Sequence, residues 1–248
     1  MKTGGIDIGS RFIKYVMLED GRVILFRKAE TGVEPLSVCR RYIEETAPDR
    51  LIATGYGRHL MEVHGDYQAV TEIKAVARGA RHMFPECRTI IDIGGQDTKA
   101  VSLNEKGSVA AFEMNDRCAA GTGKFLEVMS HALGYEVEHF GEACTDSAAS
   151  LKINSMCTVF AESEVIGLIS RGIERASIAA ALHTSVIDKV IPLVERVGVA
   201  DRIVFAGGCA RNACLVKLLQ QRVKREILVN ENPDMLAALG AALLAGED

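Results

Sequence analysis

RTIIDIGGQDTKAVSL, residues 88–103, is the stretch that decides the fold. An apolar run over residues 89–93 contains Asp92, and a polar turn over 94–98 separates it from a second run over 99–103. This pattern predicts a strand, a tight turn and a second strand, which together form a hairpin. Glycines in such a turn let backbone N–H groups approach an anion, and an adjacent aspartate can hold a hydrated Mg²⁺. The hairpin therefore has the features of a phosphate-binding loop.

The same hairpin occurs near the start of the chain, in GIDIGSRFIKYVML, residues 5–18. A shift that takes Asp7 to Asp92 also aligns identical residues at six other positions. These pairs are Ile6 and Ile91, Ile8 and Ile93, Gly9 and Gly94, Lys14 and Lys99, Val16 and Val101, and Leu18 and Leu103. Because the chain contains two copies of one hairpin, we expect them to hold a polyphosphate from two sides.

Composition narrows the class of protein. The net charge is −4 with acidic and basic residues interspersed, so nucleic acid is not an expected partner. We see no apolar run of the roughly 20 residues that span a bilayer, and no signal-peptide pattern. We therefore expect a cytoplasmic location and no membrane partner. Seven cysteines argue against a disulfide framework and for free or metal-bound thiols.

The remaining pattern predicts an α/β protein with two lobes. Residues 1–87 read as strands, helix, strand and helix, and 88–232 repeat the opening hairpin before further helices and strands. A small-residue helix over 233–248 is expected to complete the first lobe. Among the predicted elements are strands at 23–26, 51–54, 202–206 and 226–229, and helices at 70–84 and 212–223, with a long helix that includes Pro192.

A third glycine turn, Gly207-Gly208, follows the predicted strand 202–206 and precedes a helix that begins at Asn212. Backbone at such a helix N-terminus is suited to a nucleoside or phosphate. DIGS, DIGGQDTK and AGGCARN resemble the phosphate loops and the adenosine loop of the actin, sugar kinase and Hsp70 ATPases. This resemblance implies ribonuclease-H-like lobes with a nucleotide cleft between them.

CAAGTGK, residues 118–124, is not a Walker A loop. Its first glycine is replaced by Cys118, and Phe125 stands where a Mg²⁺-binding Ser or Thr is required.

Two cysteines stand out. Cys118 lies in a polar turn that enters one predicted helix, and Cys157 lies at the start of another. Backbone N–H groups at helix starts stabilise a thiolate, the form that binds metals. A cubane iron–sulfur cluster takes four thiolates, so a two-fold homodimer would complete the set, although the spacing matches no standard signature. The other cysteines are expected to be small buried apolar residues: Cys39, Cys87, Cys144, Cys209 and Cys214.

IDIGGQDTK, NDRCAAGTGKFLEVM and SMCTVFAESEV resemble the ATP-dependent activators of 2-hydroxyacyl-CoA dehydratases, a group related to the ATPase subunits of benzoyl-CoA reductase. The resemblance covers nearly the whole chain. It implies a homodimer with one 4Fe-4S cluster, bound by Cys118 and Cys157 of each protomer. It further implies ATP-driven transfer of one electron to a dehydratase or reductase, with ferredoxin or flavodoxin as donor. Cys209 and Arg211 depart from the expected adenosine loop.

The predicted roles divide the site residues into groups. Asp7 and Asp92 are assigned to Mg²⁺ and water, and Gln96 and Asp97 to positioning the attacking water. Lys14 and Lys99 are assigned to phosphate charge, with solvated strand lysines as the alternative. The other nucleotide contacts are Gly9, Ser10, Gly94 and Gly95 for the phosphates and Gly207, Gly208 and Asn212 for the nucleoside. Glu72 and Glu162 are secondary candidates.

Two other functions fit the same residues. One is an ATP-driven electron donor to a different low-potential iron–sulfur or corrinoid protein, which differs only in its partner. The other is a small-molecule kinase of the same superfamily, which would need neither a cluster nor the pair Cys118 and Cys157. The sequence alone does not name the CoA ester, the acceptor or the donor.

Overall fold

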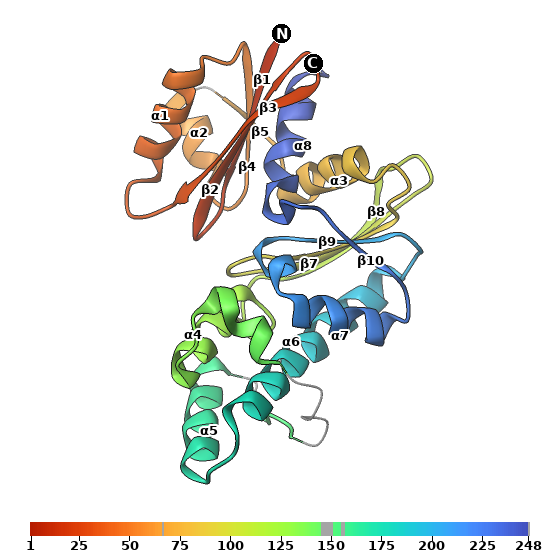
Figure 1. Cartoon of the computed structure of the whole chain (residues 1–248). Helices are drawn as coiled ribbons and strands as arrows, with labels where there is room; N and C mark the ends of the chain where they lie inside the picture. The colour runs from red at the N-terminus through yellow and green to blue at the C-terminus, as the bar shows by residue number, and fades with distance from the viewer. Residues whose placement is uncertain (66, 145–150, 155–156, 248) are drawn as a thin grey trace. The chain divides into compact units, whose positions relative to one another are not determined.

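A computed structural model describes residues 1–65, 67–144, 151–154 and 157–247. The chain divides into two compact units (Figure 1). The first comprises residues 1–88, 103–110 and 230–248, and the second comprises 89–102 and 111–229. The second unit is therefore inserted into the first along the sequence.

The first unit is built on a five-stranded mixed sheet with the order β3-β2-β1-β4-β5. Its strands are β1 (Lys2–Ile8), β2 (Phe12–Glu19), β3 (Arg22–Glu30), β4 (Arg50–Thr54) and β5 (Gln68–Ala69). The first three form an antiparallel meander, and β4 and β5 continue the sheet in parallel from β1. On one face lie α1 (Pro35–Thr46) and α2 (Arg58–Gly65), which bury Cys39, Tyr42 and Met61 (Figure 1).

Helix α8 (Leu236–Ala245) packs on the other face of the sheet, and α3 (Glu72–Met83), from a distant part of the sequence, packs against α8. They approach to backbone contact because glycines face the partner helix. A Cβ on Gly79 would lie 2.0 Å from the carbonyl oxygen of Leu236, and one on Gly240 would lie 1.8 Å from that of Ala75. The small residues of α8 are therefore needed for close packing, and the short η4 (Pro233–Met235) leads into the helix.

The second unit repeats this sheet, in the order β8-β7-β6-β9-β10 when read from the meander outward. Its strands are β6 (Thr89–Ile93), β7 (Thr98–Leu103), β8 (Val109–Asn115), β9 (Ile203–Ala206) and β10 (Ile227–Val229). Its helical segments are α4 (Gly123–Leu133), η1 (Val137–Ala143), α5 (Thr158–Ser170), α6 (Arg175–Val197), η3 (Gly208–Arg211) and α7 (Ala213–Val223). The core contains Ile91, Phe205 and Leu182, in which sheet and helices meet. The α/β class and the duplicated hairpin are thus confirmed.

Helix α6 is the longest in the part of the chain that the structure describes, and Pro192 lies within it. By length and composition alone it could cross a membrane, but 61% of its apolar window is buried inside the protein. Its apolar side chains, among them Ile178 and Val186, form part of the second core. We therefore assign it as a core helix. The sequence analysis missed α2 and η1, which are short and carry few apolar residues.

Candidate nucleotide and cysteine sites

The two predicted phosphate turns have the same backbone. In the first hairpin the N–H of Gly9 donates to the carbonyl oxygen of Phe12 at 3.1 Å, and in the second Gly94 donates to Asp97 at 2.9 Å. Each aspartate lies directly opposite a lysine on the neighbouring strand, Asp7 opposite Lys14 and Asp92 opposite Lys99. The register therefore brings together the residues that the repeat predicted, within each unit.

Asp7 is buried at the end of β1, where it is 3% exposed. Its Oδ2 accepts a hydrogen bond from Lys14 Nζ at 2.8 Å, while its buried Oδ1 has no hydrogen-bond partner among the described residues. A buried carboxylate oxygen without a partner is costly, and a hydrated cation would satisfy it. This oxygen fits the role of a Mg²⁺ or Mg²⁺-water ligand.

Lys99 is buried to 1% exposure between two carboxylates. Its Nζ lies 2.8 Å from Asp97 Oδ1 and 4.0 Å from Asp92 Oδ2. The alternative of a solvated strand lysine is therefore wrong for Lys99. It is also wrong for Lys14, whose side chain is 17% exposed and ion-paired.

The middle of each turn remains accessible. Ser10, Gly94 and Gly95 are partly buried, and Gln96 is exposed. The side chains of Ser10 and Gln96 are thus accessible from solvent, whereas the N–H of Gly94 is engaged by the carbonyl oxygen of Asp97. This accessibility is what a phosphate-binding turn requires.

Each aspartate also faces a glycine that follows a parallel strand. Gly55 follows β4 and has φ +88°, and Gly207 follows β9 and has φ +84°. A Cβ on Gly55 would lie 2.3 Å from Asp7 Oδ1, and one on Gly207 would lie 2.5 Å from Asp92 Oδ1. Both positions need glycine for backbone conformation and for space. The sequence analysis did not single out Gly55, although a strand followed by glycine occurs in both halves.

In the predicted nucleoside loop, the short η3 (Gly208–Arg211) lies between Gly207 and α7. Gly207 and Gly208 precede α7, and Asn212 is the N-cap of that helix. The side-chain oxygen of Asn212 accepts from the N–H of Leu215 at 3.1 Å, and its Nδ2 donates to His183 Nε2 at 2.9 Å. The amide of Asn212 is thus engaged by the protein, which leaves the exposed Gly208 as the accessible part of the loop.

Cys209 lies beneath the second phosphate turn. Its thiol donates weakly to the carbonyl oxygen of Gly94 at 4.0 Å, and a Cβ on Gly123 would lie 3.2 Å from its sulfur. Burial, with a smaller effect of the Asp92 carboxylate, raises the pKa of the Cys209 thiol to about 12. Cys209 therefore stays a neutral thiol and serves as packing.

The loop that carries Cys118 is tied to the second phosphate turn. The N–H groups of Gly123 and Lys124, which open α4, donate to the carbonyl oxygens of Gly94 and Gly95 at 2.9 and 2.7 Å. The buried Thr98 hydroxyl donates to the carbonyl oxygen of Gly121 at 2.6 Å. The turn and the entry to α4 are therefore joined by three hydrogen bonds.

Cys118 is exposed and lies before the first turn of α4, whose N-cap is Thr122, so it is further from that helix than expected. Asn115 holds the loop, because its Nδ2 donates to the carbonyl oxygen of Cys118 at 2.9 Å and its Oδ1 accepts from the N–H of Cys118 at 3.3 Å. Cys157 is also exposed and is the N-cap of α5. Helices α4 and α5 pack against each other within the unit.

The secondary candidates lie in different units. Glu72 is half-buried in the first turn of α3, whereas Glu162 is exposed on α5. Nothing in their placement assigns them to the phosphate turns.

The expectation that Cys144 and Cys214 are plain apolar residues is wrong, because the structure joins them in a disulfide. Cys39, Cys87 and Cys209 are buried and form no disulfide among the described residues, as expected. His183, which is fully buried on α6, has a ring nitrogen within 4.8 Å of both sulfur atoms of the pair. Burial lowers the pKa of His183 to about 4, so its ring is neutral at physiological pH.

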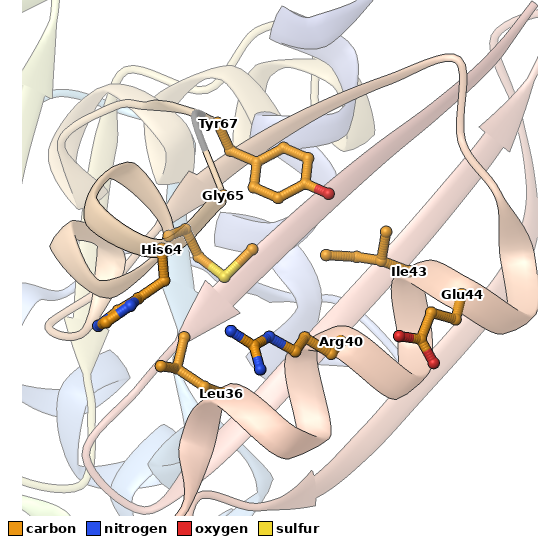
Figure 2. A pocket seen from close by; sticks show the side chains of 8 residues that line it. Leu36, Arg40, Ile43, Glu44, His64, Gly65 and Tyr67 are labelled. Carbon is orange, nitrogen blue, oxygen red and sulfur yellow. The ribbon is translucent and has the colours of Figure 1, made fainter.

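A small pocket of about 120 Å³ lies in the first unit, between α1 and the segment that includes α2. Figure 2 shows Arg40 and Ile43 on one side and His64 and Tyr67 on the other. Its lining, which also includes Leu36, Glu44, Met61 and Gly65, contains no residue that we assign to nucleotide or cluster. This pocket is therefore separate from the predicted sites.

A model of the BadF/BadG/BcrA/BcrD ATPase family matches residues 5–245. The chain belongs to this ATPase family. The ATPase is 40% identical over 257 residues to the 2-hydroxyisocaproyl-CoA dehydratase activator of Clostridioides difficile, covering 100% of this chain and 96% of that protein.

Solved structures extend this relationship. The ATPase matches the 2-hydroxyisocaproyl-CoA dehydratase activator from Clostridium difficile with bound ADPNP, with a TM-score of 0.91 and 39% identity, over 100% of this chain and 95% of that one. It also matches a ROK family glucokinase from Streptomyces griseus with a TM-score of 0.61 and 12% identity, over 100% of both chains. The second likeness shows the fold alone. The expected actin-like ATPase fold is confirmed.

Proposed function

We propose that this ATPase is an electron-transferring activator of a 2-hydroxyacyl-CoA dehydratase or a related CoA-ester reductase. The observation that carries the proposal is the hydrogen-bonded link between the second phosphate turn and the entry to α4, which adjoins the exposed Cys118. A ligand bound by Gly94 and Gly95 would thereby act on the cysteine loop through a rigid contact. The full-length similarity to a dehydratase activator supports the choice of acceptor.

The residues fit Mg·ATP as the substrate whose hydrolysis drives the electron transfer. The turns at Gly9 and Gly94 would bind phosphates, and Asp7 and Asp92 would hold Mg²⁺ and its water. Asp97, which is paired with Lys99, and the exposed Gln96 would orient the attacking water. Hydrolysis consumes ATP and water and yields ADP and phosphate. The free energy of this reaction would drive the electron toward a low-potential acceptor.

The free thiols of Cys118 and Cys157 fit a 4Fe-4S cluster held between two protomers. Both are exposed, and each chain would supply two of the four thiolates that such a cluster takes. When bound, the cluster supplies a one-electron donor of low potential. A ferredoxin or flavodoxin would supply the electron, and the dehydratase would receive it in the cytoplasm.

The surface of α5 supports a homodimer. Val159 and Phe160, which lie close after Cys157, are each 67% exposed, and Ile166 further along the helix is 55% exposed. Exposed apolar side chains of this kind are typical of a protein interface. Because the cysteine lies at the edge of this face, a second copy of the chain is the partner that would bring four thiols together.

Anaerobic purification with iron and labile sulfide counted per dimer tests the proposal. We expect about four irons per dimer, lost in Cys118→Ala and in Cys157→Ala and retained in Cys39→Ala, a matched change at a buried thiol. The holoprotein should reduce an added dehydratase only with ATP. A protein that holds no iron after reconstitution would refute the electron-transfer function and favour a phosphotransferase.

A further inference from the structure

The pair Cys144 and Cys214 has no part in the proposed function, and its surroundings are those of a built site. Three segments meet there: Cys144 follows η1, His183 lies in the middle of α6, and Cys214 lies in the first turn of α7. His183 is 0% and Cys214 is 6% exposed, whereas Cys144 is partly exposed. The site is therefore enclosed on one side and open on the other.

The geometry points to a binding site for a thiophilic divalent cation such as Zn²⁺, formed by Cys144, Cys214 and His183 when the cysteines are reduced; this is our proposal. The two sulfur atoms and a ring nitrogen of His183 lie within 4.8 Å of one another. Two thiolates and one imidazole form a common ligand set for zinc, and a water completes the tetrahedron at an open site. Cys144 provides the open side.

The imidazole is already oriented for such a role. His183 Nδ1 lies 2.7 Å from the carbonyl oxygen of Ala179, so we assign the ring proton to Nδ1 and the lone pair to Nε2. Metal-binding histidines usually donate their other N–H to a carbonyl or carboxylate in this way. The ring also packs on Phe140 with centroids 4.6 Å apart, which fixes its plane.

The disulfide and the metal site are alternative states of the same two sulfur atoms. A dithiol reductant would open the bond between Cys144 and Cys214 by supplying two electrons and two protons, and would itself become a disulfide. Zn²⁺ would then displace the two thiol protons and bind both thiolates. Because cysteines in reducing compartments more often bind metal than form structural disulfides, the dithiol is the state available to the ion.

The site also adjoins the predicted nucleoside loop. Asn212 Nδ2 donates to His183 Nε2 at 2.9 Å, and this is the lone pair that the cation would take. Binding of the metal would therefore release one bond of the residue that caps α7. The proposal itself does not depend on the iron–sulfur cluster or on nucleotide.

Zinc retention by the full chain tests the site. The Cys118→Ser/Cys157→Ser protein, which lacks the other exposed thiols, is reduced with a phosphine, incubated with ZnCl₂ and passed over a chelating resin. We expect about one zinc per protomer, lost on adding Cys144→Ser or Cys214→Ser and retained on adding Cys39→Ala. Retention of zinc in both cysteine variants, or none in the reduced parent, would overturn the proposal.

Co²⁺ gives a readout that does not require a variant at the site. The reduced parent protein should show a thiolate-to-cobalt charge-transfer band together with the visible bands of a tetrahedral ion. Oxidation with diamide, which restores the disulfide, should abolish both. His183→Gln should weaken the bands or shift the visible ones. Spectra that are unchanged by diamide would place the ion elsewhere and refute the site.

Discussion

The first and second hairpins share their backbone but differ in the residue that ends the turn. In the first, Phe12 stands there, with the ammonium of Lys28 over its ring at 4.3 Å. In the second, Asp97 stands there and binds the buried Lys99. The second turn therefore carries a carboxylate that the first lacks.

This difference indicates that the two copies of the hairpin have different roles. The first hairpin keeps one aspartate and one lysine in a direct pair of 2.8 Å, which suits holding charge. The second hairpin divides its lysine between two carboxylates and is bonded to the entry of α4. We infer that the first hairpin only binds phosphate. The second hairpin binds phosphate and also transmits the effect of binding to the cysteine loop before α4.

Lys99→Met should produce the largest loss of stability. It removes the cation from beside two carboxylates, one of them buried, at an expected cost of about 3–5 kcal/mol. Lys14→Met should cost less, about 1–3 kcal/mol, because Lys14 pairs with one carboxylate and is partly exposed. Hydrogen exchange over β6–β7 and β1–β2 would locate each loss. Equal losses of stability in the two variants would contradict the proposed difference between the hairpins. The control is Lys106→Met, at an exposed turn residue.

Asp7→Asn and Asp92→Asn should each lower ATP turnover by about 10²–10³-fold, as removal of a preorganised charge-stabilising group does. Steady-state phosphate release measures the effect. Asp20→Asn, at a turn residue whose side chain is 81% exposed, should leave turnover unchanged. If only one of the two variants is impaired, the hairpins do not share the Mg²⁺ and water between them.

Gly55→Ala and Gly207→Ala should each destabilise their own unit by about 1–3 kcal/mol through backbone strain, with added crowding against Asp7 or Asp92. Urea denaturation would measure the loss of stability, and hydrogen exchange in the strands of each sheet would show which unit is affected. Gly21→Ala has φ +79° and no contact within 4 Å, so it isolates the strain from the crowding. If Gly21→Ala destabilises the protein as much as the other two changes, crowding against the aspartates makes no added contribution.

Thr98→Val should have the smallest effect, about 1–2 kcal/mol, because it removes one buried hydrogen bond to Gly121. The change should speed hydrogen exchange in residues 116–122 more than in the hairpin itself. Ile13→Val, at the equivalent position of the first hairpin, is the matched control. Unchanged exchange in the loop would argue against transmission through this contact.

The repeat made most of the fold predictable. Identical residues at fixed spacing located both hairpins, and the apolar periodicity located α6, because these signals are local and strong. The partner of Lys99 was not predictable, since Asp92 and Asp97 are both near it in sequence and only the turn conformation decides between them.

The sequence analysis did not predict the contacts between segments that are distant in the sequence. Cys144 and Cys214 are 70 residues apart and belong to no recognisable spacing, so sequence alone left them as apolar residues. Asn212 was predicted to contact a nucleoside because of its place after a glycine turn, and the sequence did not indicate that its amide also caps α7 and binds His183. Such a role depends on α6, which no local pattern connects to that loop.

The packing of α8 on α3 has a consequence for synthesis of the chain. The first unit begins at the first strand, yet it receives α8 only after the ribosome has made the entire second unit. Until then the α8-facing side of its sheet, including Gly5 and Ile52, has no cover from that helix. The first unit is therefore completed only by the last helix of the chain, and a sheet that formed earlier during translation would expose the apolar face that α8 covers.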